Sequence, residues 1–193
     1  MSSSIALIVG LGNPGTEHEQ NRHNIGFWFV DALAKQAGAS FRKESKFHGD
    51  VCRVTLHGHD VWLLKPGTYM NRSGQSVSAF ASFYKISPDN ILIVYDELDL
   101  PPGTARLKQD GGHGGHNGMR DVIAHLGTKN FNRLRIGIGH PGNSSEVADY
   151  ILRNPSKSDR EQIERALDDA LRALPDVLDG DMQKAMHALH TEN

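Results

Sequence analysis

The chain has 193 residues, a length that favours a single domain whose core needs no disulfide or metal to hold it. Its net charge of −2 excludes a polycation, and its one cysteine, Cys52, excludes both an intrachain disulfide and a metal site built from thiolates. The first apolar run, residues 5–9, is too short for a signal peptide or a membrane span. We therefore expect a cytoplasmic protein that does not bind membranes.

Apolar runs and periodic apolar stripes alternate along the chain. The runs that predict strands are residues 5–9, 51–56, 61–64, 91–95 and 134–138. The stripes that predict helices are residues 26–37, 77–84, 119–126, 158–174 and 182–189. We expect Ser158 to cap the long fourth helix and Pro175 to end it.

Strands interleaved with helices predict one α/β domain over residues 1–193, with a twisted mixed β-sheet flanked by helices. Residues 144–193 are expected to form a helical lid followed by the C-terminal helices. Within them, the segment around Ser144–Asn154 is expected to gate access to a site.

A glycine loop, Gly10–Gly15, follows the first strand and fits the G-x-G-x-x-G pattern of dinucleotide-binding proteins. That function also needs a helix that begins inside the motif and an acid at the end of the second strand. Here the helical stripe begins only near Gly26, and the acid at the right distance, Asp31, lies within it. We therefore expect the loop to present the Asn13 amide at the carboxyl end of the sheet.

His23 and Asp96 are the candidate acid–base pair. His23 follows the glycine loop and has amides nearby in sequence, and Asp96 ends the buried strand 91–95. A carboxylate hydrogen-bonded to an imidazole fixes its tautomer and makes it more basic. Because no serine or cysteine lies in a nucleophile-elbow pattern, the base would activate water.

Two other clusters admit a metal as well as a metal-free interpretation. Asp96, Glu97 and Asp99 fit no known cation-binding loop, and His113 with His116 forms an H-x-x-H pair that lacks an evident third ligand. The Gly-rich segment 111–118 is better suited to hold an anion or donate to an oxyanion at the start of a helix. A flexible lid without chemistry is the alternative for this segment.

Two further features suit a nucleic acid. Tyr69 and Asn71 offer a stacking face beside an amide, and a turn or cap role is the alternative for Asn71. The cations outnumber the acids between residues 103 and 135, which permits a local polyanion site or a solvated surface of uneven charge. These cations are Arg106, Lys108, Arg120, Lys129, Arg133 and Arg135.

Taken together, the motifs closely resemble bacterial peptidyl-tRNA hydrolases, in the family's order and over about residues 5–142. The segments that carry the resemblance are 10–15, 22–26, 69–74, 96–103, 111–118 and 135–141. The resemblance implies a monomeric, cofactor-free and metal-free α/β enzyme with no obligate protein partner. Its substrate would be peptidyl-tRNA, bound at the acceptor end and 3′ CCA, and it would release tRNA for reuse in translation.

The resemblance also implies roles for individual residues. His23 is the general base, Asp96 holds it in its basic form, and Asn13 senses the acylated amino group that distinguishes peptidyl-tRNA from aminoacyl-tRNA. The residues implied to contact substrate are Tyr69, Asn71 and Asn117, with Asn117 also placing the water, and His116 lies at the edge of the site. The implied phosphate contacts are Lys108, Arg133 and Arg135.

The chain departs from the family at two positions, where it has His18 for the usual Tyr and Asn21 for the usual Thr. Either His18 keeps a planar stacking role at the tRNA end or that contact is weaker. Three other classes stay open at this point: a dinucleotide oxidoreductase, a metal hydrolase and a non-catalytic RNA-binding module.

Overall fold

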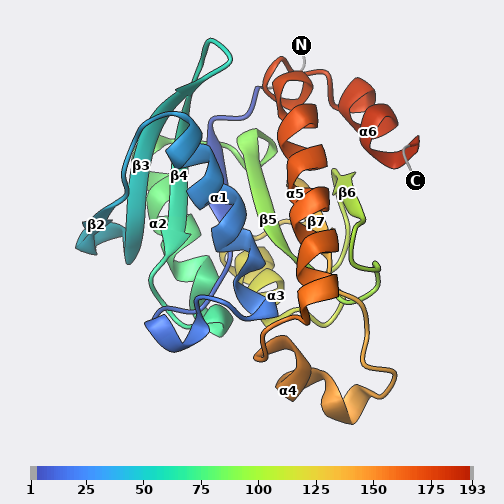
Figure 1. The fold of residues 1–193 in the computed structure, drawn as a ribbon. Helices are drawn as coiled ribbons and strands as arrows, with labels where there is room; N and C mark the ends of the chain where they lie inside the picture. The colour runs from blue at the N-terminus through green and yellow to red at the C-terminus, as the bar shows by residue number, and fades with distance from the viewer. Residues whose placement is uncertain (1–3, 192–193) are drawn as a thin grey trace.

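The computed structural model describes residues 4–191, which form one mixed seven-stranded sheet with helices on both faces (Figure 1). The strand order is β2-β3-β4-β1-β5-β7-β6, with β1 parallel to β4 and β5, and β5 parallel to β7. The α/β fold with a mixed sheet, predicted from the sequence, is confirmed. The strands are β1 Leu7–Gly10, β2 Arg42–Glu44, β3 Gly49–Leu56, β4 His59–Pro66, β5 Ile91–Glu97, β6 Ala105–Lys108 and β7 Asn132–Gly137.

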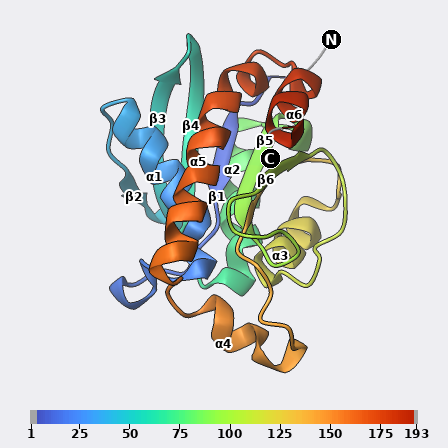
Figure 2. The same cartoon turned by 45° about the vertical axis from the view of Figure 1, so that its right-hand side comes forward.

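Helices pack on both faces of the sheet, and a short pair of helical turns lies beyond one end of it (Figure 2). The α-helices are α1 Ile25–Gln36, α2 Ser73–Tyr84, α3 Asn117–Leu126, α4 Val147–Ile151, α5 Lys157–Leu178 and α6 Met182–Thr191. The 3-10 turns are η1 Thr16–His18, η2 Arg22–Asn24, η3 Ser45–Phe47, η4 Met70–Arg72, η5 Pro88–Asn90 and η6 Ser144–Glu146. None of the helices within residues 4–191 is long and apolar enough to cross a bilayer.

The strands alternate their side chains between two cores, as their period of two requires. In β5, Leu92 and Val94 pack on the side of α1 and α5, whereas Ile93 and Tyr95 pack on the side of α2 and α3. By the same alternation, Asp96 lies on the α1 side of the sheet. The central strands are therefore buried on both faces, which explains their continuous apolar sequences.

The structure differs from the predicted elements at four places. Strands β2 and β6 were not predicted, because they are short and rich in charged residues. The cap of α5 is Ser156 rather than Ser158, since the Ser156 side chain accepts a hydrogen bond from the Asp159 amide. Pro175 does not end α5, which continues to Leu178 because the residues after the proline remain buried in the core.

Candidate active site

His23 is placed by η2, directly before α1, at the end of the sheet where β1 and β5 finish. Helix α1 approaches the sheet so closely that a Cβ on Gly26 would lie 2.4 Å from the Val94 carbonyl oxygen. A Cβ on Gly10 would lie 2.2 Å from the Gly26 carbonyl oxygen. Glycine at both positions allows the helix to pack against the strand ends and brings His23 to Asp96.

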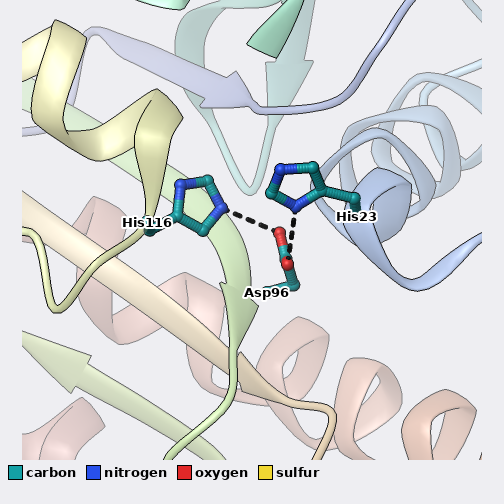
Figure 3. Close-up of side chains that lie close together, drawn as sticks. All are labelled: His23, Asp96 and His116. Carbon is teal, nitrogen blue, oxygen red and sulfur yellow. Dashed lines mark hydrogen bonds and ion pairs between the residues drawn. The ribbon is translucent and has the colours of Figure 1, made fainter. Parts of the chain in front are cut away.

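His23 and Asp96 form a buried hydrogen-bonded pair. The His23 Nδ1 lies 2.8 Å from Asp96 Oδ2, and the residues are 5% and 3% exposed (Figure 3). A carboxylate accepts a hydrogen bond, so the neutral imidazole carries its proton on Nδ1 and leaves Nε2 as an acceptor. A general base that takes a proton from water needs this tautomer.

The second oxygen of the same carboxylate is bound by His116. Its Nε2 lies 2.9 Å from Asp96 Oδ1, and its Nδ1 accepts from the Met119 amide 3.2 Å away as the N-cap of α3. Because Nδ1 accepts, Nε2 must donate, and Asp96 therefore receives an N–H from each imidazole. The two rings lie 4.8 Å apart between centroids.

The Asp96 carboxylate is stabilised in its charged form. Burial alone would raise its pKa, but the attraction of His23 and His116 and their hydrogen bonds hold the pKa of Asp96 well below the ordinary value. The carboxylate is therefore ionised at neutral and mildly acidic pH.

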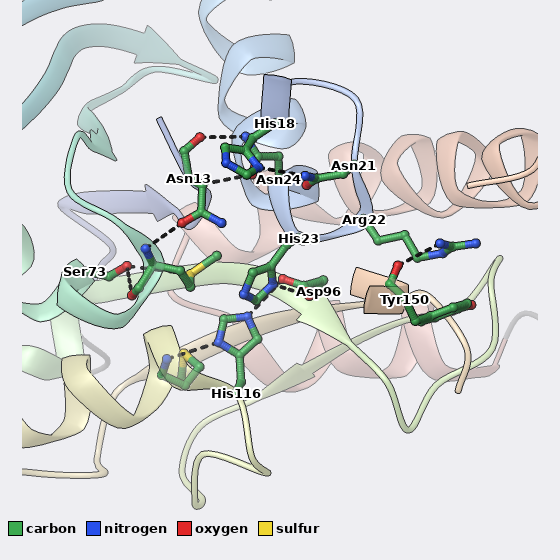
Figure 4. A network of polar contacts seen from close by, with 12 residues as sticks. Asn13, His18, Asn21, Arg22, His23, Asn24, Ser73, Asp96, His116 and Tyr150 are labelled. Atoms are coloured by element: carbon green, nitrogen blue, oxygen red, sulfur yellow. Dashed lines mark hydrogen bonds and ion pairs between the residues drawn. The ribbon is translucent and has the colours of Figure 1, made fainter. Parts of the chain in front are cut away.

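Asn13 is held in one orientation by contacts that do not include His23 (Figure 4). Asn24 Oδ1 accepts from the Asn13 backbone amide at 2.8 Å, and Asn24 Nδ2 donates to the Asn13 carbonyl at 2.9 Å. The Met70 amide donates to Asn13 Oδ1 at 2.7 Å. Since the side-chain oxygen is occupied, Asn13 presents its NH₂ group as a donor.

A cavity of about 260 Å³ adjoins the His23–Asp96 pair. Polar groups line one part of it and the helical turns of residues 144–151 line another. Asn117, at the start of α3, is among the lining residues, so the structure brings it together with His23, Asp96 and His116. The apolar lining residues include Leu98, Val147 and Ile151.

Other predicted site residues surround this centre. Tyr69 and Asn71 are exposed and flank Met70, whose amide contacts Asn13. His18 and Asn21, the two departures from the family, contact each other through Asn21 Nδ2 and His18 Nδ1 at 3.0 Å. A change at either position therefore alters the surroundings of the other.

The three predicted phosphate contacts have different exposures. Lys108 is exposed at the end of β6, and Arg135 is partly exposed, with its guanidinium 3.7 Å from Glu97 Oε1. Arg133 is fully buried and donates to the carbonyls of Gly112 at 2.9 Å and Lys129 at 2.7 Å. In this structure the Arg133 side chain is buried and two of its nitrogens donate to backbone carbonyls, so a phosphate contact by this residue stays a prediction and is not used in the proposals below.

Asn24 was not among the residues that the sequence singled out as part of the site. Its neighbour His23 drew attention to the segment, but sequence spacing does not show that Asn24 reaches back eleven residues to Asn13. Arg22 was also missed as a separate residue, because a buried arginine cannot be distinguished from an exposed one without the packing around it.

The two alternatives suggested by motifs fit this geometry poorly. Two 3-10 turns separate the glycine loop from α1, so the helix does not begin inside the motif as the dinucleotide fingerprint requires. Among the described residues, His23, Asp96 and His116 form the one group of three potential metal ligands. Their atoms already pair with each other, while Glu97 contacts Arg135 instead of joining Asp96.

Comparisons with known proteins confirm the family resemblance predicted from the sequence. The family model described as peptidyl-tRNA hydrolase matches residues 7–193. The chain is 55% identical to a peptidyl-tRNA hydrolase from Neisseria meningitidis serogroup A, over all of both chains. It is 53% identical to one from Marinobacter nauticus, over 99% of this chain and 97% of the other.

A crystal structure of peptidyl-tRNA hydrolase from Acinetobacter baumannii superposes with a TM-score of 0.97 at 49% identity, covering 100% of this chain and 98% of the other. Both the sequence and the fold thus match over the whole length. The chain belongs to the peptidyl-tRNA hydrolase family.

Proposed function

We propose that this enzyme hydrolyses the ester of peptidyl-tRNA with His23 as the general base, without a metal. The observation that carries the proposal is the bond from His23 Nδ1 to Asp96, because it leaves Nε2 free to take a proton. In the proposed step, Nε2 takes a proton from water as the water oxygen bonds to the ester carbonyl carbon. The carbon–oxygen bond to the 3′ ribose then breaks, and the proton passes to the departing ribose oxygen.

We propose that amide groups bind the reacting ester. The Asn13 NH₂ group donates to the carbonyl that an acylated amino group carries and a free amino group lacks, so it favours peptidyl-tRNA over aminoacyl-tRNA. Asn117 places the water, and Asn71 with nearby amides stabilises the oxyanion. Tyr69 and His18 contact the terminal nucleotides.

Outside the reacting centre, we propose that Lys108 and Arg135 contact phosphates of the acceptor end. We further propose that the enzyme acts as a cytoplasmic monomer with no obligate protein partner, and sedimentation at working concentrations would test the monomer. Residues 144–193 supply the lid and the C-terminal helices in this proposal.

The test is hydrolysis of N-acetylaminoacyl-tRNA in EDTA by the wild type and His23→Ala. We expect the wild type to retain its activity, and the variant to lose at least about a hundredfold, the typical share of general-base catalysis. Loss of wild-type activity in EDTA would instead indicate a metal hydrolase. Binding of tRNA without cleavage of the ester would indicate an RNA-binding module.

His59→Ala is a matched control, because His59 Nε2 also lies 2.8 Å from an aspartate, Asp179, but at the surface and far along the chain from the site. This variant should keep full activity. An equal loss in His59→Ala and His23→Ala would contradict the assignment of the base.

A further inference from the structure

The segment of residues 144–153, which we call the lid, is attached to the rest of the protein with little help from the core. It contains η6 and α4, and none of the residues of these two turns is buried. Tyr150 and Ile151 are only partly buried against the core. A segment with so few buried apolar contacts depends on specific anchors for its position.

Arg22 supplies several of these anchors at once (Figure 4). Its Nη1 donates to the carbonyls of Tyr150 at 2.8 Å and Arg153 at 3.3 Å, and its backbone amide donates to the same Arg153 carbonyl at 3.1 Å. The guanidinium carbon lies 3.7 Å from the centre of the Tyr150 ring, which is cation–π distance. The Tyr150 hydroxyl in turn donates to the Ile138 carbonyl at 2.6 Å.

Burying the Arg22 guanidinium among these partners costs free energy of folding. Arg22 is 7% exposed, its partners here are carbonyls and a ring rather than a carboxylate, and its Nε has no hydrogen-bond partner within the described residues. A buried charge and an orphaned N–H both oppose folding. Arg22 also directly precedes His23 in η2. Contacts that fix the Arg22 backbone therefore also restrain the backbone from which the His23 side chain extends.

We propose that Arg22 is a positioning residue that couples the lid to the catalytic histidine. When the lid is seated on Arg22, η2 is held and His23 keeps its bond to Asp96; when the lid lifts, η2 loses that support. The inference rests on the proposed role of His23, and it adds a residue that contacts neither substrate nor the reacting atoms.

The test is a double-mutant cycle of Arg22→Met and Tyr150→Leu, measured as kcat/KM on N-acetylaminoacyl-tRNA. We expect each single change to lower kcat/KM about tenfold, which corresponds to losing the free energy of one desolvated cation–π contact. Because both variants break the same contact, the double variant should lose about as much as either single variant, not the hundredfold that independent effects would give.

Two further readouts separate positioning from loss of fold or of tRNA binding. Hydrogen exchange of amides 144–153 should be faster in Arg22→Met, while the thermal midpoint and the salt dependence of KM stay close to wild type. Arg22→Lys, which keeps the charge but loses the planar stacking group, should recover part of the activity. If Arg22→Met does not fold, the cycle is run with Arg22→Lys and Tyr150→Leu.

Arg160→Met is the matched control, because Arg160 also stacks on an aromatic ring, Trp28, at 4.5 Å and also bonds a distant segment through Gln20. It should stay within about twofold of wild type. Additive losses in the cycle, or unchanged lid exchange in Arg22→Met, would overturn the inference even if the wild type is active and His23→Ala is not. An inactive wild type would overturn the proposed function itself.

Discussion

A single carboxylate organises both imidazoles of the candidate active site. Asp96 accepts from His23 on one oxygen and from His116 on the other, so each ring has one defined tautomer. The Met119 amide fixes His116 independently, since it donates to the other nitrogen of that ring. The orientation of His23 therefore depends on the start of α3 as well as on β5.

The pH dependence should reflect the imidazole and not the carboxylate. Because the pKa of Asp96 is held below its ordinary value, this group stays charged as the pH falls from 8 to 5. A histidine base works only when neutral, so kcat/KM should fall on the acid side of neutrality. Steady-state rates from pH 5 to 9 test this, and a flat profile down to about pH 5 would count against a histidine base.

Asp96→Asn should be far more damaging than His116→Ala. The amide of an asparagine offers one acceptor and one donor, so one imidazole would face an N–H and have to switch its tautomer. We expect kcat to fall about 10²- to 10⁴-fold in Asp96→Asn, the share of general-base catalysis. His116→Ala removes the N-cap bond from the Met119 amide and one of the two hydrogen bonds to Asp96. Only the bond to Asp96 touches the base pair, a contribution of about 0.5–1.5 kcal/mol, so kcat should fall about tenfold or less. Equal losses in the two variants would contradict this division of roles.

Sequence reasoning located His23 and Asp96 because each carries a local signal, a histidine after a glycine loop and a carboxylate at the end of a buried strand. Their roles as base and partner came from the family resemblance. The contact of Asp96 with His116 and that of Asn24 with Asn13 could not be predicted, because both depend on how loops from separate elements meet.

At the scale of elements, the basic residues of the middle segment are divided between the edge strand β6 and its inner neighbour β7. Lys108 is opposite Arg133, and Arg106 is opposite Arg135. Arg133, on the inner strand β7, is buried and bonds the Gly112 carbonyl, whereas Lys108, on the edge strand β6, is exposed. Two basic residues that look alike in sequence therefore lie in different environments.

Lys108→Gln and Arg133→Gln should consequently give opposite phenotypes. Loss of one phosphate contact should reduce the slope of log KM against log salt by about 0.7 to 0.9 in Lys108→Gln, with little change in stability. Arg133→Gln should leave that slope unchanged and lower the free energy of unfolding by about 1–3 kcal/mol, because it removes the two hydrogen bonds that Arg133 donates to the Gly112 and Lys129 carbonyls. Kinetics over a salt series and urea unfolding check the pair, and an unchanged slope in Lys108→Gln would remove it from the tRNA interface.

The main helices and central strands were predicted because their apolar patterns are long and correspond to the faces that neighbouring elements bury. The short charged strands β2 and β6 were not, since they exist only through pairing with β3 and β7. In helix α5, packing likewise overrides the local sequence. Pro175 favours termination, but residues after it are buried and the helix continues to Leu178.

For the whole molecule, the two cores on either side of the sheet meet the active site through adjacent residues of β5. Asp96 lies on the side of α1, and its neighbour Tyr95 packs in the other core, with its ring 5.1 Å from that of His116. Burial, together with Glu97, raises the pKa of Tyr95 to about 12, against the opposing effect of Arg133 and Arg135.

This raised pKa makes a prediction about alkaline stability. A tyrosine that ionises near 10 when unfolded and near 12 when folded contributes stability below pH 10 that is lost as the pH rises toward 12. The free energy of unfolding of the wild type should therefore fall relative to that of Tyr95→Phe by about 2 to 3 kcal/mol between pH 9 and pH 12. Urea titrations of both proteins measure this, and a constant difference would show that Tyr95 does not ionise with unfolding.

The bonds that hold Asn13 run to Asn24 and Met70 and not through His23, so we expect substrate binding to survive the loss of the proposed base. His23→Ala should then act as a trap: it should capture intact peptidyl-tRNA, hold it for far longer than the enzyme's own turnover, and still discriminate against aminoacyl-tRNA. Filter binding with both ligands would show this, and equal retention of the two would mean that recognition needs the base after all. An enzyme built in this way can become a reagent for collecting stalled translation products from a mixture.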